Sequence, residues 1–312
     1  MRITTSFAYD AAVSNLQNRQ QSLSQSQEQL TSGLRVLRAS DDPAAAARAE
    51  RARAASARAD GEQRALGASR NAMQMTESTL GHAGELVQQA RELLLSAGNA
   101  TQTGAERKII GEALRGLRND LFALSNRVDG SGGGRGRYLF GGQGSDMPPL
   151  QDTPAGVVYI GTGGTQNVAS GESTPLAIDG QATWLGTTDP ADASATISVF
   201  SALDKMIAAL QTPGQTSAQV AQTISTGLTE LDATAGTLSS WRSRAGESLN
   251  RIDAISGRLS GQKLDAERER SAAEDLDMVA AISDFQNRQT GYDAALKSYS
   301  IVQRLSLFDY LR

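Results

Sequence analysis

Cysteine is absent from this 312-residue sequence, and histidine and aromatic residues are scarce. Without cysteine, the chain has no disulfides, thiolate metal sites or cysteine nucleophiles. The only histidine, His82, cannot build a histidine-rich metal site, and a Ser–His pair would also need an acid placed to orient the ring. Aromatic residues make up 4% of the chain, fewer than a compact globular core normally uses. The composition therefore suits long helices packed side by side along thin seams.

Long apolar runs and a strong excess of one charge are also missing. No run of 18 apolar residues occurs, so we expect no membrane span. The N-terminus, MRITTSFAYDAAVSNL, lacks the apolar core of a cleaved signal peptide, so any export must use a route without cleavage. The 30 basic and 34 acidic residues give a net charge of −4, without a run rich in lysine and arginine. Nucleic acid is therefore not an expected partner.

The strongest pattern in the sequence is a heptad-like spacing of apolar residues. They recur at alternating steps of four and three, or at steps of seven, which places them on one narrow stripe of a helix. Gln20 and Gln27 lie on the first stripe, where a polar residue weakens packing but can fix the register. The stripes predict helices over residues 9–30, 66–94, 110–128, 220–259 and 279–305. The second helix would run from Pro43 to about Leu95 if its glycines do not interrupt it.

The segment from residue 137 to about 190 has a different character. Short β-like runs such as VVYIG and LAID alternate with glycine-rich turns, and prolines cluster between them. The sequence GTGG at 161–164 predicts a hairpin turn. Helix is expected to return near Ala195 and to end before Pro213. We therefore predict a small β-rich insertion within an otherwise helical chain.

The order of these segments is nearly symmetric about the insertion. Helices from the two ends would run beside each other as an elongated antiparallel helical bundle or coiled coil, which makes the fold class mainly α. We expect terminal coiled-coil segments at 1–42 and 266–312, a helical domain at 43–136 and 195–265, and a β-rich insertion at 137–194.

The stretch LTSGLRVLRASDDPAAAA, residues 30–47, gathers charged residues between two predicted helices. Adjacent Asp41 and Asp42 could serve acid–base chemistry or bind a cation, but a joint between helices explains the pattern better. Gly33 would end the first helix, Asp42 would cap the second, and Pro43 would take its first position. Arg35 and Arg38 could pair either within the chain or with a neighbouring subunit, and the sequence leaves both possibilities open.

The glycine runs DGSGGGRG and GTGG do not match phosphate-binding loops. Neither contains GxGxxG or GxxxxGK[ST], and neither joins a strand to a following helix. The patch ERER at 267–270 mixes both signs, as a solvated helix face does. We therefore predict no catalytic residue, no cofactor-binding residue and no metal ligand.

Several of these motifs together resemble a known family. LTSGLR followed by SDDPAAAA is similar to the N-terminal signature of the flagellin superfamily. The MRITT start, the RYLFGG run and the C-terminal YDAALKSYSIVQRLSLFDYLR resemble one branch of it, the hook-filament junction proteins of the hook-associated protein 3 type. The resemblance covers both termini and the start of the β region, whereas residues 143–190 match only loosely.

The resemblance implies a role in the bacterial flagellum. It implies export through the flagellar type III apparatus to the extracellular junction, and head-to-tail self-assembly into a ring. The terminal segments would form the inner layer, and the insertion would face outward. Expected partners are the other hook-filament junction protein (FlgK-like), flagellin, and a cytosolic export chaperone (FlgN-like) that binds the C-terminal segment.

We expect the stripes of the two terminal segments to be incompletely buried in the monomer and to be completed on assembly, because segments short of apolar surface tend to fold on binding. The aromatic residues of the C-terminal stripe are expected to pack in a core, and their packing partner need not lie in the same chain. The predicted seam residues are Val13, Leu16, Leu23, Leu30, Phe285, Tyr292, Leu296, Tyr299, Val302, Leu305, Leu307 and Leu311.

Two other functions remain as alternatives. A filament-forming flagellin shares the structural class, although Pro43, RYLFGG and the SLFDYLR ending favour the junction branch. A secreted enzyme or effector would need a site in the β insertion, where only isolated acidic residues occur.

Overall fold

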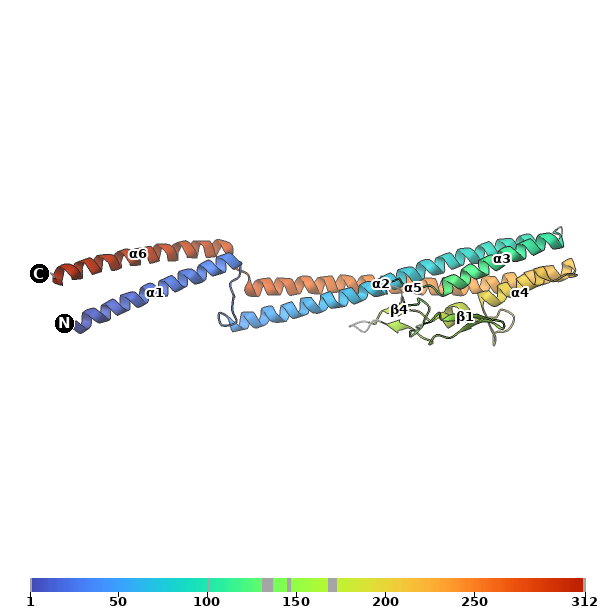
Figure 1. Cartoon of the computed structure of the whole chain (residues 1–312), viewed down its shortest axis with the longest axis horizontal. Coiled ribbons are helices and arrows are strands. Elements are labelled where there is room, and N and C mark those ends of the chain that lie inside the picture. Colours follow the sequence, from blue (N-terminus) through green and yellow to red (C-terminus); the bar gives the residue numbers. More distant parts are fainter. Residues whose placement is uncertain (1, 100–101, 131–136, 145–146, 168–172, 311–312) are drawn as a thin grey trace. The chain divides into compact units, whose positions relative to one another are not determined.

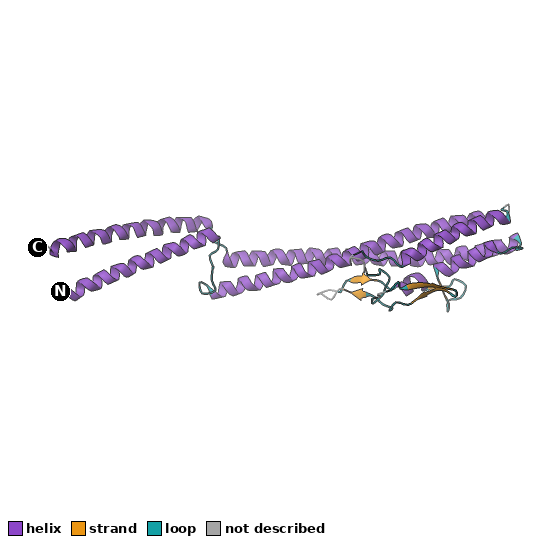
Figure 2. Ribbon diagram, in the orientation of Figure 1, coloured by secondary structure: helices purple, strands orange, loops and turns teal. Residues whose placement is uncertain are grey.

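The computed structural model describes residues 2–99, 102–130, 137–144, 147–167 and 173–310. The chain forms two compact units: unit 1 contains Met1–Ala59 and Ser260–Arg312, and unit 2 contains Asp60–Leu259. Helix predominates in both units, and the few short strands belong to unit 2 (Figure 2). The prediction of a mainly α fold with a small β region is confirmed.

The helices follow the predicted stripes closely. They are α1 (Arg2–Ser32), α2 (Pro43–Ala97), α3 (Gly104–Ser125), α4 (Val199–Gln211), α5 (Ser217–Glu274) and α6 (Met278–Tyr310). Helix α2 runs unbroken through its glycines, as the sequence allowed. Helices α2 and α5 each continue from one unit into the other.

Within unit 2, α2 and α5 pack as an antiparallel pair. Ion pairs join Arg91 Nε to Asp232 Oδ1 at 3.0 Å and Arg242 Nε to Glu77 Oε1 at 2.7 Å, so residue numbers fall along α5 as they rise along α2. These exposed pairs set the register but contribute little stability. The seam itself is apolar, and its buried residues include Leu66, Met73, Leu80, Val87 and Leu94 of α2 and Ile224, Leu231, Leu238 and Ile252 of α5.

Two predicted helix boundaries are shifted in the structure. Helix α3 ends at Ser125 rather than at residue 128, because the Asn126 side chain exchanges two hydrogen bonds with the backbone of Leu150, at 2.9 and 3.0 Å. Val128 instead forms an antiparallel bridge with Tyr138. Helix α4 begins at Val199 rather than near Ala195, because Thr196–Ile197 forms a strand before Ser198 caps the helix.

The β region consists of three separate two-stranded antiparallel sheets. The pairs are β1 (Leu150–Thr153) with β2 (Gly156–Tyr159), β3 (Gln166–Asn167) with β4 (Pro175–Ala177), and β5 (Thr187–Thr188) with β6 (Thr196–Ile197). A short π-helix, η1 (Gln181–Leu185), lies between β4 and β5.

The hairpin prediction for GTGG at 161–164 is wrong. This segment connects β2 to β3, which pair with different partners, and the observed hairpin turn joins Thr153 to Gly156. GTGG lies instead against the RYLFGG segment, where Gly142 forms a parallel bridge with Thr162. Gly142 has a φ of +64°, and a side chain there would have its Cβ 1.9 Å from the carbonyl oxygen of Thr162. Only glycine fits this close approach.

An aromatic cluster anchors the β region to the helices. The Trp184 ring lies between Phe140, at 5.2 Å, and Phe200 of α4, at 6.0 Å between centroids. Beside it, Arg118 of α3 is only 8% exposed and forms ion pairs with Asp152 of β1 and Asp204 of α4. Its guanidinium also lies over the rings of Phe122 and Phe200. Arg118 thus connects α3, β1 and α4. Because its side chain is buried, its positive charge must be paired, and the two aspartates provide that pairing.

We expect this ion pair to make unit 2 sensitive to acid. The hydrogen bond from Arg118 holds the pKa of Asp152 below its usual value. The pair therefore stabilises the fold above the unfolded pKa of about 4, and that contribution is lost as the pH falls through the lowered folded pKa. Urea unfolding between about pH 5 and pH 2.5 should show a smaller loss of stability for Asp152→Asn than for the wild type. Asp120→Asn, at an exposed site on α3, is the control and should lose stability as the wild type does.

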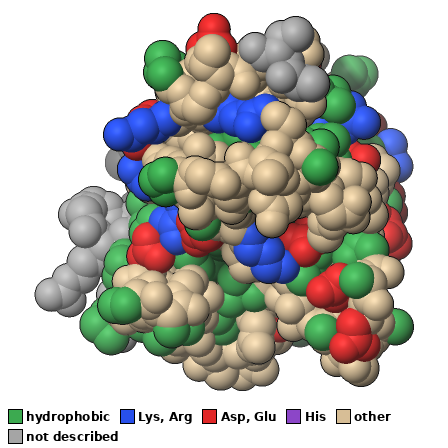
Figure 3. Space-filling view, turned by 90° about the vertical axis from the view of Figure 1, so that its right-hand side faces the viewer, with side chains coloured by type: hydrophobic (Ala, Val, Ile, Leu, Met, Phe, Trp, Pro, Cys, Tyr) green, Lys and Arg blue, Asp and Glu red, His purple; other side chains and the backbone are tan. Residues whose placement is uncertain are grey.

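The surface charge of unit 2 is mixed. Figure 3 faces the end at which the α2–α3 and α4–α5 connections lie, and there basic and acidic side chains are interspersed among polar ones. A face with mixed charges does not produce the positive electrostatic potential that attracts nucleic acid to a protein.

Candidate assembly interface

Helices α1 and α6 form an antiparallel pair in unit 1 (Figure 1). The rings of Tyr9 and Tyr299 lie 5.7 Å apart at an interplanar angle of 45°. Further along, Arg288 donates to the carbonyl oxygen of Ser22 at 3.3 Å and also to its hydroxyl. The pairing brings the two terminal segments of the chain together.

The predicted seam residues on these helices are only partly covered. Val13, Leu16, Leu23 and Leu30 of α1 are half-buried, as are Phe285, Tyr292 and Tyr299 of α6. Leu296 is 40% exposed. By contrast, the equivalent stripe of α2 in unit 2 is buried. The two-helix pair therefore leaves apolar surface that a neighbouring chain could cover.

The C-terminal end of the predicted seam lies outside the described side chains. The backbone of Val302, Leu305 and Leu307 belongs to α6, but their side chains lie outside the described residues, as does all of Leu311. Their role in the seam remains a proposal.

The structure also adds apolar residues that the seam prediction omitted. Val279 is 79% exposed, and further large apolar side chains on the two helices are exposed as well: Phe7, Met278, Ile282 and Ile301. Val279 and Ile282 belong to the C-terminal stripe, so spacing alone could have selected them. Phe7, Met278 and Ile301 lie off the predicted stripes, and no sequence signal distinguishes them.

The joint between α1 and α2 has the geometry of a helix stop followed by a helix start. Gly33 has a φ of +72°, and its N–H donates to the Gln29 carbonyl at 2.9 Å. Asp42 Oδ1 accepts from the Ala45 N–H at 2.9 Å, and Pro43 is the first residue of α2. Asp41 holds the loop between them, since its Oδ2 accepts from the N–H groups of Leu37 and Arg38.

The two arginines of the joint pair within the chain. Arg35 lies 3.3 Å from Asp42 Oδ2 and also donates to the Ala273 carbonyl at 2.6 Å. Arg38 lies 3.3 Å from Glu28. Arg35 connects the cap of α2 to the end of α5, whereas Arg38 connects the loop to α1.

A backbone bridge joins the α1–α2 loop to the α5–α6 connection. Leu34 pairs with Asp275, the Arg35 N–H donates to the Glu274 carbonyl at 2.7 Å, and the Leu276 N–H donates to the Gly33 carbonyl at 2.9 Å. Asp277 then begins α6 by accepting from the Val279 and Ala280 N–H groups. Main-chain hydrogen bonds thus join the segment that follows α1 to the segment that precedes α6.

Glu274 is the central side chain of this joint, and sequence analysis missed it. Its side chain is 4% exposed and receives Arg53 Nη2 of α2 at 2.5 Å and Arg270 Nη1 at 2.6 Å. A buried carboxylate is tolerated because both oxygens are paired with cations. Arg53 lies 221 residues away in sequence, so no local pattern could have revealed the pair.

Removing the Asp42 cap should loosen the start of α2. The Ala45 N–H holds the pKa of Asp42 below its usual value, which shows that the ionised carboxylate is the stabilised form. In Asp42→Ala the first amides of α2 lose an acceptor, and hydrogen exchange at Ala45 and Ala46 should become about fivefold faster. Asp42→Asn keeps an acceptor oxygen and should exchange nearly as slowly as the wild type. Equal exchange in both variants would contradict the capping role.

Other kinds of site find no support in the described part of the chain. No group of three or more histidine or acidic side chains there is arranged to hold a metal ion. No described helix is long and apolar enough to cross a membrane. His82 is exposed, with its Nδ1 3.9 Å from Glu85, so it belongs to the solvated face of α2.

Comparison with known proteins gives consistent matches. Residues 3–144 match the family described as the bacterial flagellin N-terminal helical region. Flagellar hook-associated protein 3 of Escherichia coli (strain K12) is 27% identical over 99% of both chains, and that of Salmonella typhimurium is 27% identical over 100% of both. The crystal structure of Xanthomonas campestris FlgL superposes with a TM-score of 0.59 at 20% identity, covering 72% of this chain and 99% of that one. These matches confirm the resemblance drawn from the sequence motifs.

Proposed function

We propose, from a similarity to flagellar hook-associated protein 3 that extends along the whole chain, that this protein is a structural component of the bacterial flagellum. Its place is the junction between the hook and the filament, where it links hook-associated proteins to flagellin. The full-length match is the observation that carries this proposal. The role is mechanical rather than catalytic, in keeping with the absence of cysteine and the single exposed histidine.

Assembly would complete the terminal seams. The half-buried stripe of α1, with Leu16, Leu23 and Leu30, and the partly exposed stripe of α6 offer apolar surface that neighbouring copies cover. A contact between different faces of successive copies is head-to-tail, so it produces a ring or a helix rather than a closed dimer. Burial of the seams would then be coupled to polymerisation.

The proposed division of the chain follows from this role. Segments 1–42 and 266–312 form the inner layer, 43–136 with 195–265 form the helical body, and 137–194 faces outward. The joint at Gly33, Arg35, Asp41, Asp42 and Pro43 orients the inner layer relative to the body. Export without signal cleavage, a cytosolic chaperone on the C-terminal segment, and direct contact with the other junction protein and with flagellin complete the proposal.

Deletion of the gene in its own bacterium tests the junction role. The deletion strain should carry hooks without filaments and should release flagellin into the medium, because the filament has no base on which to assemble. Expression of the full chain in that strain should restore filaments. Normal filaments in the deletion strain would overturn the proposal.

A filament-forming flagellin is the second candidate, because residues 3–144 match the flagellin helical region. Purified protein separates the two functions. A junction protein should remain in short assemblies, whereas a flagellin should grow into long filaments visible by electron microscopy.

A further inference from the structure

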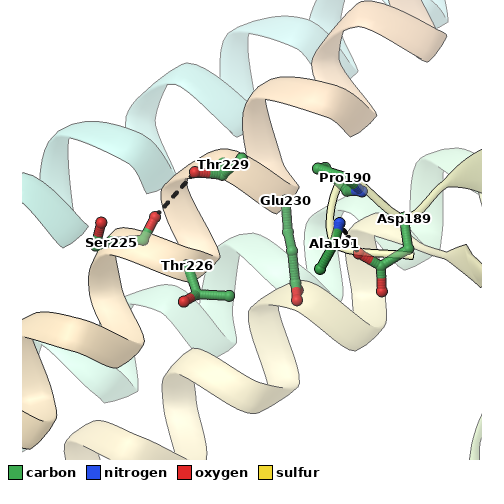
Figure 4. A pocket seen from close by; sticks show the side chains of 7 residues that line it. All are labelled: Asp189, Pro190, Ala191, Ser225, Thr226, Thr229 and Glu230. Atoms are coloured by element: carbon green, nitrogen blue, oxygen red, sulfur yellow. Dashed lines mark hydrogen bonds between the residues drawn. The ribbon is translucent and has the colours of Figure 1, made fainter. Parts of the chain in front are cut away.

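Unit 2 has a hollow of about 230 Å³ between α5 and residues 189–191 (Figure 4). Several of its polar groups are engaged within the chain. The hydroxyls of Thr226 and Thr229 donate to carbonyls of their own helix, and Asp189 accepts from the Ala191 N–H at 2.8 Å. The volume is also below the 300 Å³ or more that is typical of sites for small molecules, so we assign no ligand to it.

Unit 1, by contrast, contains two oxidisable rings in contact, Tyr9 of α1 and Tyr299 of α6. Their centroids lie 5.7 Å apart at an interplanar angle of 45°, within the range of about 4.5–7 Å at which aromatic rings interact. In the described part of the chain, this is the only contact between two tyrosine rings. Tyr9 is 50% exposed and Tyr299 is half-buried, so a dissolved oxidant can reach the pair.

The two rings are close enough to be joined edge to edge. A dityrosine bond links the ring carbons next to the two phenol oxygens, and the facing edges of the rings lie closer together than their centroids do. Because half of the Tyr9 side chain is exposed, its ring can rotate on the picosecond-to-nanosecond scale of surface side chains. A modest rotation therefore brings such a carbon of one ring against the other, while the pairing of α1 with α6 keeps the rings together.

We propose that Tyr9 and Tyr299 form a site of oxidative cross-linking, at which a peroxidase acting with hydrogen peroxide joins the two rings by a carbon–carbon bond. Each phenol loses one electron and one proton, and the two phenoxyl radicals combine at the carbons next to their oxygens. The hydrogen on each of these carbons then moves to the oxygen, which restores both phenols. The two electrons and two protons reduce one molecule of peroxide to two of water.

The bond would hold the two terminal helices together covalently. Since the chain has no cysteine, a disulfide cannot do this. The cross-link would limit how far α1 and α6 separate when the pair opens, so hydrogen exchange of the amides beside the two rings should slow after oxidation. The site uses contacts within one chain and does not depend on the junction role.

The test is treatment of the full-length chain with horseradish peroxidase and hydrogen peroxide, followed by tryptic digestion and mass spectrometry. A cross-linked peptide should join residues 3–19 to residues 298–304 with the loss of two hydrogen atoms, and dityrosine fluorescence should appear in the monomer band of a denaturing gel. Tyr9→Phe and Tyr299→Phe should each abolish both signals, and each keeps a ring for the contact between the helices. Tyr292→Phe is the matched control, because it makes the same substitution at another half-buried position of α6, within the separate peptide 289–297.

The yield of this product should not change when the protein is diluted, and it should fall in urea, which separates the two helices. The proposal is overturned if the peptide joining 3–19 to 298–304 is missing, or if it forms as readily in urea. It is also overturned if this peptide occurs only in cross-linked dimers, or if Tyr292→Phe lowers its yield as much as Tyr9→Phe does.

Discussion

Leu296→Asp should abolish assembly while leaving unit 2 folded. Leu296 is 40% exposed on α6 in the single chain, so a polar residue there costs the monomer little. In the proposed seam, a neighbouring copy covers the side chain. Losing a buried leucine costs about 2 kcal/mol, and desolvating a carboxylate adds more, so the affinity between subunits should fall about a hundredfold or more. Complementation of the deletion strain with this variant should leave the cells non-motile.

The control for this substitution is Ser298→Asp, which adds the same charge at an exposed polar position two residues further along α6. It should restore filaments nearly as well as the wild type does. Thermal unfolding of unit 2, followed by the fluorescence of its buried Trp184, should be unchanged in both variants. Motility of Leu296→Asp cells equal to that of the wild type would show that this face of α6 is not in the seam.

Local sequence signals predicted the helices and their ends at the joint. The end of α1 at Gly33 and the start of α2 at Pro43 depend on residues next to each other in the chain, and the structure places both boundaries there. Stripe spacing likewise located the buried seam of α2. The spacing could not tell how far the stripes of α1 and α6 are buried, because burial depends on how many helices surround each one.

The β region and the buried polar groups were harder to predict because their partners are distant in sequence. The turn GTGG resembles a hairpin locally, but β2 pairs with β1, which Asp152 ties to Arg118 of α3. Glu274 and Glu230 look like ordinary charged helix residues until α2 and α4 bring Arg53 and Lys205 against them. An isolated sequence contains no signal for such pairs.

Glu274→Lys should disrupt the joint more than any other single change in unit 1. Glu274 is buried between Arg53 and Arg270, and its carbonyl accepts from the Arg35 N–H. A lysine would place a third positive charge at this site and remove the carboxylate that Arg53 and Arg270 share, which leaves Arg53 only Glu50 and Arg270 only Asp275 as acidic partners. Breaking a buried pair in this way costs about 3–5 kcal/mol. Hydrogen exchange at the Arg35 and Leu276 amides, which form the backbone bridge, should therefore accelerate by about a hundredfold or more.

Two further variants decide whether the charge of Glu274 causes this effect. Glu267→Lys makes the same substitution at an exposed position of α5, and its exchange rates should match the wild type. Combining Glu274→Lys with Arg53→Glu reverses the pair, and because the two side chains still meet at the same place, the double variant should recover part of the lost protection. If the joint is what positions the terminal helices for assembly, filaments should be lost in Glu274→Lys and partly regained in the double variant. Filaments that persist while the bridge amides exchange rapidly would show instead that assembly does not depend on the closed joint.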